Sequence, residues 1–246
     1  MRLAVLASGR GSNLGALLAA RGAGRLGFTL AGVFSDRPEA PALALAAAAG
    51  APALALAPRA YPDRAAHDAA LGDAVAAVQP DLIVLAGYMR VLADAFVGRF
   101  EGRMLNIHPS LLPKHRGLHT HAAALAAGDT EHGASVHRVT PELDGGPVLA
   151  QVRMPIEPGD TPEMLAARLL PLEHGLLVST LSLLVQPDVR IQPGTLDVAG
   201  HSVATPLCWN PDDGLVPALA ADPVPELLAS LHTAHRRNAE PLHRPL

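Results

Sequence analysis

The chain has 246 residues, of which 49% are hydrophobic and only 3% aromatic, and its formal net charge at pH 7 is −4. This length suits one large α/β domain, or a domain of about 200 residues with an appendage. The acidic balance and the lack of a run of lysines or arginines argue against a nucleic-acid partner bound through phosphates. The single cysteine, Cys208, cannot form an internal disulfide, which is typical of a reducing compartment.

Two apolar segments resemble targeting or membrane signals, and both are too short. Residues 3–7 run directly into a glycine-rich turn, so they lack the length of a secretory signal. Residues 43–57 are interrupted by Gly50 and Pro52 and fall short of the roughly 20 apolar residues that a membrane span needs. We therefore expect a cytoplasmic protein with no membrane partner.

Apolar runs alternate with alanine-rich stretches through the first half of the chain. This pattern predicts strands at 2–7, 28–34, 52–56, 81–86 and 103–107, and helices at 13–23, 41–50, 63–78 and 91–100. Continuous apolar strands separated by helices are typical of a parallel sheet covered on both faces. The predicted fold class is α/β, a doubly wound, mostly parallel, Rossmann-like sheet with a C-terminal appendage. Such sheets bind ligands at the carboxyl ends of their strands.

The second half has a different order of elements. A short helix is expected at 119–127, strands at 134–139 and 148–154, and a long helix at 161–185 with Thr161 as N-cap and Pro162 in the first turn. Short strands at 190–192, 195–198 and 202–204 and a helical run at 225–232 complete the prediction. We therefore divide the chain into a main domain, 1–188, and a C-terminal hairpin and irregular extension, 189–246.

A glycine-rich turn, residues 8–13, follows the first predicted strand and precedes a helix. Glycines allow a sharp turn and a close approach to a ligand, and the helix amino end presents free N–H groups to an anion. Gly11, Ser12 and Asn13 are therefore candidate phosphate ligands. The turn lacks the Gly-Lys-Ser/Thr of a Walker loop, and Leu14 stands where a dinucleotide loop has its third glycine, which favours a phosphomonoester. A simple N-capped turn remains the alternative.

A second group of polar residues follows the strand expected at 103–107. Asn106 and His108 are two residues apart, so alternation places both side chains on one face of the strand. Asp144 lies further along, in a turn followed by two glycines.

These residue types suit acyl transfer to an amine. An amide and a protonated imidazole can donate to the oxyanion that forms when an amine attacks a formyl carbon. We expect the Asp144 carboxylate to raise the pKa of His108 above its ordinary value of about 6.5. Simpler roles remain open: Asn106 could cap a loop, His108 could bind backbone, and Asp144 could form a plain turn.

Several segments together resemble one family, the phosphoribosylglycinamide formyltransferases, which are folate-dependent enzymes of purine synthesis. The similar segments, in order, are residues 6–14, 84–90, 106–113, 117–121 and 132–147, and the resemblance extends over about residues 1–200. It implies a formyltransferase-type Rossmann-like catalytic domain. It also implies transfer of the formyl group of 10-formyltetrahydrofolate, as co-substrate, to the amine of 5'-phosphoribosylglycinamide, by a monomer or homodimer.

The resemblance also implies roles for particular residues. Asn106, His108 and Asp144 match the catalytic residues of the family, and Glu173 matches the residue that holds the glycinamide. The phosphate site corresponds to Gly11, Ser12 and Asn13. The folate pocket corresponds to Arg64, Met89, Arg90, Val91, Leu92, Asn106, Thr140, Pro141, Glu142, Leu143 and Asp144. No metal site is implied.

The chain departs from the family in residues 170–172, where Pro171 precedes Glu173 within a helix, and in the basic residues 114–116. Rival functions are methionyl-tRNA formyltransferase, which carries a basic C-terminal domain, and formyltetrahydrofolate deformylase, which has an extra N-terminal domain. A non-catalytic sugar-phosphate binding module is a further alternative, because it would need the loop at 8–13 but not the three polar residues together.

Overall fold

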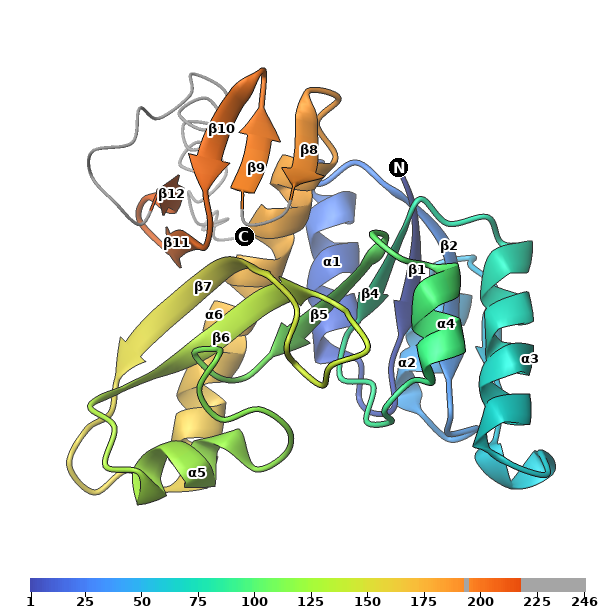
Figure 1. The fold of residues 1–246 in the computed structure, drawn as a ribbon, viewed down its shortest axis with the longest axis horizontal. Coiled ribbons are helices and arrows are strands. Elements are labelled where there is room, and N and C mark those ends of the chain that lie inside the picture. The colour runs from blue at the N-terminus through green and yellow to red at the C-terminus, as the bar shows by residue number, and fades with distance from the viewer. Residues whose placement is uncertain (193–194, 218–246) are drawn as a thin grey trace, which may run out of the picture.

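The computed structural model describes residues 1–192 and 195–217. The first half contains β1 (Arg2–Leu6), α1 (Ser12–Gly22), β2 (Thr29–Ser35), α2 (Pro41–Ala48), β3 (Ala53–Ala55), the 3-10 turn η1 (Pro58–Ala60), α3 (Arg64–Ala77), β4 (Leu82–Leu85), α4 (Asp94–Arg99) and β5 (Met104–His108) (Figure 1). The second half contains α5 (Thr120–Ala126), β6 (Glu131–Arg138), β7 (Val148–Pro155), α6 (Pro162–Leu184), β8 (Val189–Gln192), β9 (Thr195–Val198), β10 (His201–Ala204), β11 (Leu207–Asn210) and β12 (Gly214–Pro217).

The described strands form a nine-stranded sheet and a small three-stranded sheet. The large sheet has the order β12-β11-β7-β6-β5-β4-β1-β2-β3, and β1 to β5 are parallel to one another. β6 runs antiparallel to β5, and β7 runs antiparallel to β6. The strand order reverses between β1 and β4, so this is the switch point at which such sheets bind ligands. The predicted fold class, α/β with a mostly parallel sheet, is confirmed.

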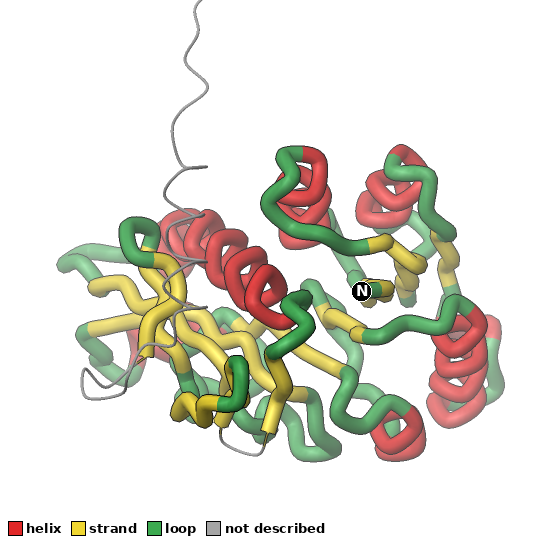
Figure 2. Tube along the Cα trace, turned by 90° about the horizontal axis from the view of Figure 1, so that it is seen from above, coloured by secondary structure: helices red, strands yellow, loops and turns green. Residues whose placement is uncertain are grey.

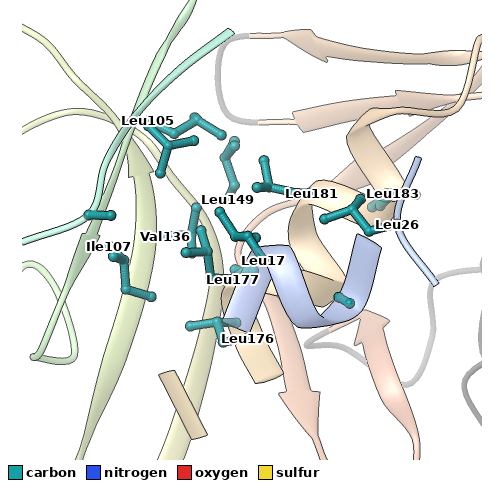
Figure 3. Close-up of a cluster of buried hydrophobic side chains, with 14 of the residues drawn as sticks. Leu17, Leu26, Leu105, Ile107, Val136, Leu149, Leu176, Leu177, Leu181 and Leu183 are labelled. Atoms are coloured by element: carbon teal, nitrogen blue, oxygen red, sulfur yellow. The ribbon is translucent and has the colours of Figure 1, made fainter. Parts of the chain in front are cut away.

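Helices cover both faces of the parallel strands, as Figure 2 shows from above. α1, α2 and α6 pack on one face with Leu3 and Val5 of β1, and α3 and α4 pack on the other with Ala4 and Leu6. In Figure 3, Leu17 of α1 and leucines of α6 lie beside the side chains of β5 and β6. This two-sided burial is the reason that the strands read as continuous apolar runs.

α6 is a core helix of 23 residues. The Thr161 hydroxyl accepts a hydrogen bond from the Met164 N–H at 3.3 Å, so the predicted N-cap is observed. By length and composition α6 alone among the described helices could cross a membrane. Leu165, Leu169 and Leu177 are, however, completely buried against the large sheet. Burial of this kind is the usual reason that a core helix is long and apolar.

One helix begins later than predicted. Residues 91–93 are not helical, and α4 starts at Asp94. The reason is tertiary: the Ala93 N–H donates to the buried Asp68 carboxylate of α3 at 2.7 Å, which holds the preceding residues out of a helix. The residues before α4 are therefore free to line a cavity at the sheet edge.

The C-terminal region contains the predicted three-stranded meander β8 to β10, and also a hairpin that the pattern did not reveal. β11 pairs in parallel with β7, and β12 pairs with β11, so both extend the large sheet. The Trp209 indole of β11 donates to the Ser179 hydroxyl of α6 at 2.8 Å. Division of the chain at residue 188 stays a prediction, and the helical run at 225–232 lies outside the described residues.

Candidate active site

The loop between β1 and α1 leaves the amino end of α1 open. Gly11 is the N-cap and has a left-handed backbone (φ 73°), and no side chain caps the helix. A Cβ atom at this position would lie 2.8 Å from the Ala42 Cβ of α2, so only glycine fits. The first turn of α1 contains no acidic residue. Its N–H groups, those of Ser12 and Asn13 included, are therefore available to an anion.

Glu173 of α6 reaches the same end of α1. Burial raises the pKa of Glu173 to about 7, and a hydrogen bond with the Asn13 side chain opposes this shift. Asn13 is itself buried, and its Oδ1 atom has no partner among the described residues. The structure therefore brings the candidate phosphate loop and the candidate glycinamide residue together.

Asn106, His108 and Asp144 converge at the end of β5. Asn106 Nδ2 lies 3.4 Å from Asp144 Oδ1, and His108 Nδ1 lies 3.6 Å from Asp144 Oδ2. β5 presents the first two residues on one face, and the loop between β6 and β7 carries the third across to them. Asp144 has a left-handed backbone (φ 48°), which turns its side chain toward the strand end.

Asp144 is held in its ionised form. Burial would raise the pKa of this carboxyl, but contact with His137 and the hydrogen bond from the Gly117 N–H at 2.8 Å outweigh burial and lower the pKa. Asp144 therefore presents a fixed negative charge to the His108 imidazole at neutral pH.

His108 differs from the sequence-based expectation. Burial lowers the pKa of this imidazole below 6.5 and outweighs the opposing effects of the His115 carbonyl and Asp144, so the prediction of a raised pKa is wrong. The resting imidazole is neutral. Because a carbonyl oxygen only accepts, the Nε2 atom, which lies 3.0 Å from the His115 oxygen, carries the proton. The Asp144 carboxylate, which also only accepts, lies 3.6 Å from Nδ1, so both ring nitrogens face acceptors.

His137 belongs to the same cluster and was missed by the sequence analysis. It lies opposite Asn106 in the pairing of β6 with β5, and it is 2% exposed. Its Nδ1 atom donates to the Arg138 carbonyl at 2.9 Å, and its Nε2 atom lies 3.1 Å from Asn106 Nδ2. This contact orients the Asn106 amide. The only signal for His137 is its position opposite Asn106, and this position is known only once the register between β5 and β6 is known.

A cavity of about 560 Å³ opens above these three converging residues. Its rim is apolar: Met89, Val91, Leu118 and Leu143 are each at least half exposed. The cavity extends to Gly87, which accepts a hydrogen bond from the Ser8 N–H at 3.0 Å at the start of the phosphate loop. A candidate anion site and a large apolar-rimmed cavity are therefore adjacent at the switch point of the sheet.

A smaller cleft shares several lining residues with this cavity and contains most of the candidate folate residues. It is lined by Arg90, Val91, Leu92, Asn106, Thr140, Pro141, Glu142, Leu143 and Asp144. Met89 lines the main cavity instead. Arg64 lines neither of the two: it is half exposed, and its Nε lies 3.6 Å from Asp68 Oδ2. Among the described residues, Arg90 Nε and the Tyr88 hydroxyl are buried without partners, so the cleft offers polar atoms to a ligand.

A metal centre finds no support in the described ranges, which contain no group of three or more His, Cys, Asp or Glu side chains able to hold an ion.

Comparisons of the sequence with known proteins point to one family. The family described as "Formyl transferase" matches residues 1–181. The chain is 47% identical to the phosphoribosylglycinamide formyltransferase of Escherichia coli (strain K12), over 72% of this chain and 83% of that protein. It is 43% identical to the protein of the same name from Mycobacterium tuberculosis (strain ATCC 25618 / H37Rv), over 77% of this chain and 87% of that protein.

Solved structures of two related enzymes share the fold. The phosphoribosylglycinamide formyltransferase of Coxiella burnetii superimposes with a TM-score of 0.78 at 42% identity, covering 83% of this chain and 96% of that chain. A formyltetrahydrofolate deformylase from Pseudomonas syringae pv. tomato superimposes with a TM-score of 0.73 at 25% identity, covering 80% of this chain and 65% of that chain.

Proposed function

Because this chain belongs to the phosphoribosylglycinamide formyltransferase family, we propose that it transfers the formyl group of 10-formyltetrahydrofolate to the amine of 5'-phosphoribosylglycinamide in purine biosynthesis. The observation that carries the proposal is the convergence of Asn106, His108 and Asp144 beside the open amino end of α1. The cytoplasm is the compartment that fits this function. A monomeric or homodimeric state stays a prediction.

The acceptor substrate binds at α1. The N–H groups of Ser12 and Asn13 donate to its phosphate, aided by the positive end of the helix dipole. Glu173, whose pKa lies at about 7 because of burial, holds the glycinamide portion. Both groups belong to rigid helices, so the acceptor amine is directed toward the cavity with little freedom. Such orientation of two substrates can lower the barrier by up to ~7–11 kcal/mol.

The formyl donor binds in the cavity and the smaller cleft. Met89 and Leu143 provide apolar contacts for the flat ring systems of a folate, and the unpartnered Tyr88 hydroxyl and Arg90 Nε offer polar atoms deeper inside. These features fit a long, mostly aromatic ligand with a polar edge. Arg64 stays a proposed contact for the outer part of the ligand only.

His108 accepts a proton from the attacking amine and then donates it to the leaving group. As the amine forms its bond to the formyl carbon, the His108 imidazole accepts one amine proton. The Asp144 charge, 3.6 Å from Nδ1, stabilises the imidazolium that results. The same proton then passes to the folate nitrogen as the carbon–nitrogen bond to the donor breaks. His108 thus serves first as base and then as acid.

Asn106 stabilises the charge on oxygen. Attack moves the carbonyl electron pair onto the formyl oxygen, and the Asn106 amide, together with the new imidazolium, donates to it. Collapse of the intermediate restores the carbonyl on the product. Loss of one such donor costs about 2.7–4 kcal/mol of barrier.

The direct test is a formyl-transfer assay with purified protein, 10-formyltetrahydrofolate and phosphoribosylglycinamide, in which the formylated product and free formate are both measured. We expect acceptor-dependent product, and a kcat at least a hundredfold lower for His108→Ala. His201→Ala, a substitution at an exposed position of β10, is the matched control. Release of formate without acceptor at the same rate would instead indicate a deformylase, and near-normal turnover by His108→Ala would remove His108 from the mechanism.

A further inference from the structure

The Asp68 carboxylate of α3 is buried, with a side chain only 3% exposed. Its Oδ1 atom lies 2.8 Å from His67 Nδ1, and its Oδ2 atom accepts a hydrogen bond from the Ala93 N–H at 2.7 Å. The same Oδ2 atom lies 3.6 Å from Arg64 Nε. Because burial of a carboxylate is costly unless polar partners replace water, both oxygens of Asp68 are engaged in contacts that hold neighbouring groups in place.

His67 fixes the position of this carboxylate. The His67 side chain is completely buried, and its Nε2 atom lies 3.0 Å from the Leu56 carbonyl oxygen. The Tyr61 ring packs edge-on against the imidazole, with 5.3 Å between the ring centroids. The Leu56 N–H donates to the Ser35 carbonyl, at the end of β2, at 2.8 Å. Asp68 is therefore connected to the large sheet through His67 and Leu56.

The segment that ends at Ala93 forms one wall of the smaller cleft. Residues 90–92 line the cleft, and Ala93 is the N-cap of α4, with φ −69° and ψ 150°. Leucine and alanine favour helix, and the sequence pattern predicts a helix at 91–100, yet residues 91–93 are not helical. The local sequence therefore opposes the observed conformation of this wall, and the hydrogen bond from Ala93 to Asp68 supports it.

Loss of the Asp68 acceptor would weaken the cleft wall. The Ala93 N–H would lack its partner, and the segment would sample conformations of which only some keep residues 90–92 at the cleft. A ligand that binds only the competent conformation loses affinity in proportion to the population of that conformation. The acceptor substrate, which we place at α1, binds on the opposite face of the sheet from α3 and α4. The effect should therefore be confined to the formyl donor.

We propose that Asp68 is a positioning residue for the formyl donor: through the Ala93 N–H, it holds residues 90–92 in the conformation that forms the cleft wall. This inference rests on the proposed function, in which the cleft binds the folate. Asp68 itself contacts no substrate, because it lines a separate hollow between α3 and α4 that shares no lining residue with the cleft. Its role concerns affinity for one substrate and not the chemical step.

The test compares Asp68→Ala and Asp68→Asn with the wild-type protein. Alanine removes the acceptor, whereas asparagine keeps one oxygen for the Ala93 N–H and an NH2 group that can donate to His67 Nδ1. For Asp68→Ala, we expect the KM for 10-formyltetrahydrofolate and the calorimetric Kd for tetrahydrofolate to rise about tenfold, which corresponds to about 1.4 kcal/mol. The acceptor KM and kcat should stay within twofold. For Asp68→Asn, all four constants should stay within threefold of the wild type.

A second substitution tests the route through Ala93. Proline at this position fits the observed φ of −69°, needs no acceptor and keeps the preceding residue out of a helix. Its ring would collide with the Asp68 carboxylate, which lies 2.7 Å from the nitrogen atom, so it is combined with Asp68→Ala. The double variant Asp68→Ala/Ala93→Pro should bind tetrahydrofolate within threefold of the wild-type Kd. A merely structural role of Asp68 predicts no such recovery.

Asp73→Asn is the matched control, because it removes another carboxylate of α3 that contacts α4. Asp73 Oδ1 lies 2.7 Å from Arg99 Nη1, and neither residue lines the cleft. Its KM, kcat and Kd values should equal those of the wild type. If Asp68→Ala does not fold, the double variant His67→Leu/Asp68→Leu replaces the buried polar pair by apolar side chains, removes the same acceptor and should give the same rise in the donor KM and Kd.

The proposal is overturned if a folded Asp68→Ala protein binds tetrahydrofolate within twofold of the wild-type Kd, if Asp68→Asn weakens binding as much as alanine does, or if the proline variant brings no recovery. Failure of the proposed function is a distinct result, because the wild-type protein would then form no formylated product. Hydrogen exchange of the Ala93 amide, followed by NMR without substrate, should show protection in the wild type and in Asp68→Asn, and its loss in Asp68→Ala. Protection that persists in Asp68→Ala would also overturn the proposal.

Discussion

Asp144→Asn is the most direct probe of the charge arrangement in the site. The substitution keeps the shape of the side chain and removes the charge that lies 3.6 Å from His108 Nδ1. At an effective dielectric constant near 20, two unit charges at that distance attract by about 4–5 kcal/mol, an upper bound on what Asp144 contributes to the imidazolium. Each 1.36 kcal/mol is a factor of ten in rate. We therefore expect kcat to fall by about a hundredfold to a thousandfold.

The pH profile gives a second, independent readout of the same substitution. Burial already lowers the pKa of His108, so the acidic limb of the wild-type kcat profile should lie below pH 6.5. Asp144 acts to raise that pKa, so its removal should move the limb to still lower pH. Steady-state kinetics from pH 4.5 to 9 with saturating substrates measure both effects.

The control for this experiment is Asp73→Asn, which removes a 76% exposed carboxylate from the surface of α3. Its kcat and its pH profile should equal those of the wild type. A kcat for Asp144→Asn within threefold of wild type, or an acidic limb that moves to higher pH, would refute the reasoning.

Two further substitutions test stability. Burial raises the pKa of Glu173 to about 7, whereas the same carboxyl in an unfolded chain has a pKa of 4.5. Between these two pH values the native protein keeps a proton that the unfolded chain releases. The free energy of unfolding should therefore fall as the pH rises through this window. In urea unfolding at pH 8, we expect Glu173→Gln to be more stable than the wild type by about 1–3 kcal/mol, and the difference should vanish near pH 4.5. A stability difference that does not change with pH would contradict the role of the Glu173 proton. Gly175→Ala should destabilise the protein by about 1–3 kcal/mol, because the new methyl group would overlap the Trp209 indole. Gly98→Ala, in open space on α4, is the control, and equal stabilities of the two alanine variants would show that the indole moves aside at little cost.

The secondary structure was largely predictable, because both faces of the strands are buried and the apolar runs are therefore continuous. The errors arose where a distant residue decides the local conformation. Asp68, far from α4 in the chain, keeps residues 91–93 out of the helix through the Ala93 N–H. The β11–β12 hairpin forms by pairing with β7 and by the packing of Trp209 on α6, neither of which leaves a periodic signal.

The candidate site was likewise predictable only in part. Motifs identified Asn106, His108 and Asp144, and the structure brings these side chains together, while their roles stay predictions. No motif identified His137. It contacts Asn106 rather than forming a recognisable pattern, so only the structure reveals it.

The residues of this chain by themselves determined the order of strands and helices as far as the small meander and the chemical types available for acyl transfer, because these follow from periodicity and functional groups. Only the tertiary structure decided the protonation of the site. The pKa of His108 depends first on burial and then on the His115 carbonyl and the Asp144 charge, and these are properties of how the chain packs. Charge and proton position are therefore consequences of folding, even where every participating residue could be named beforehand.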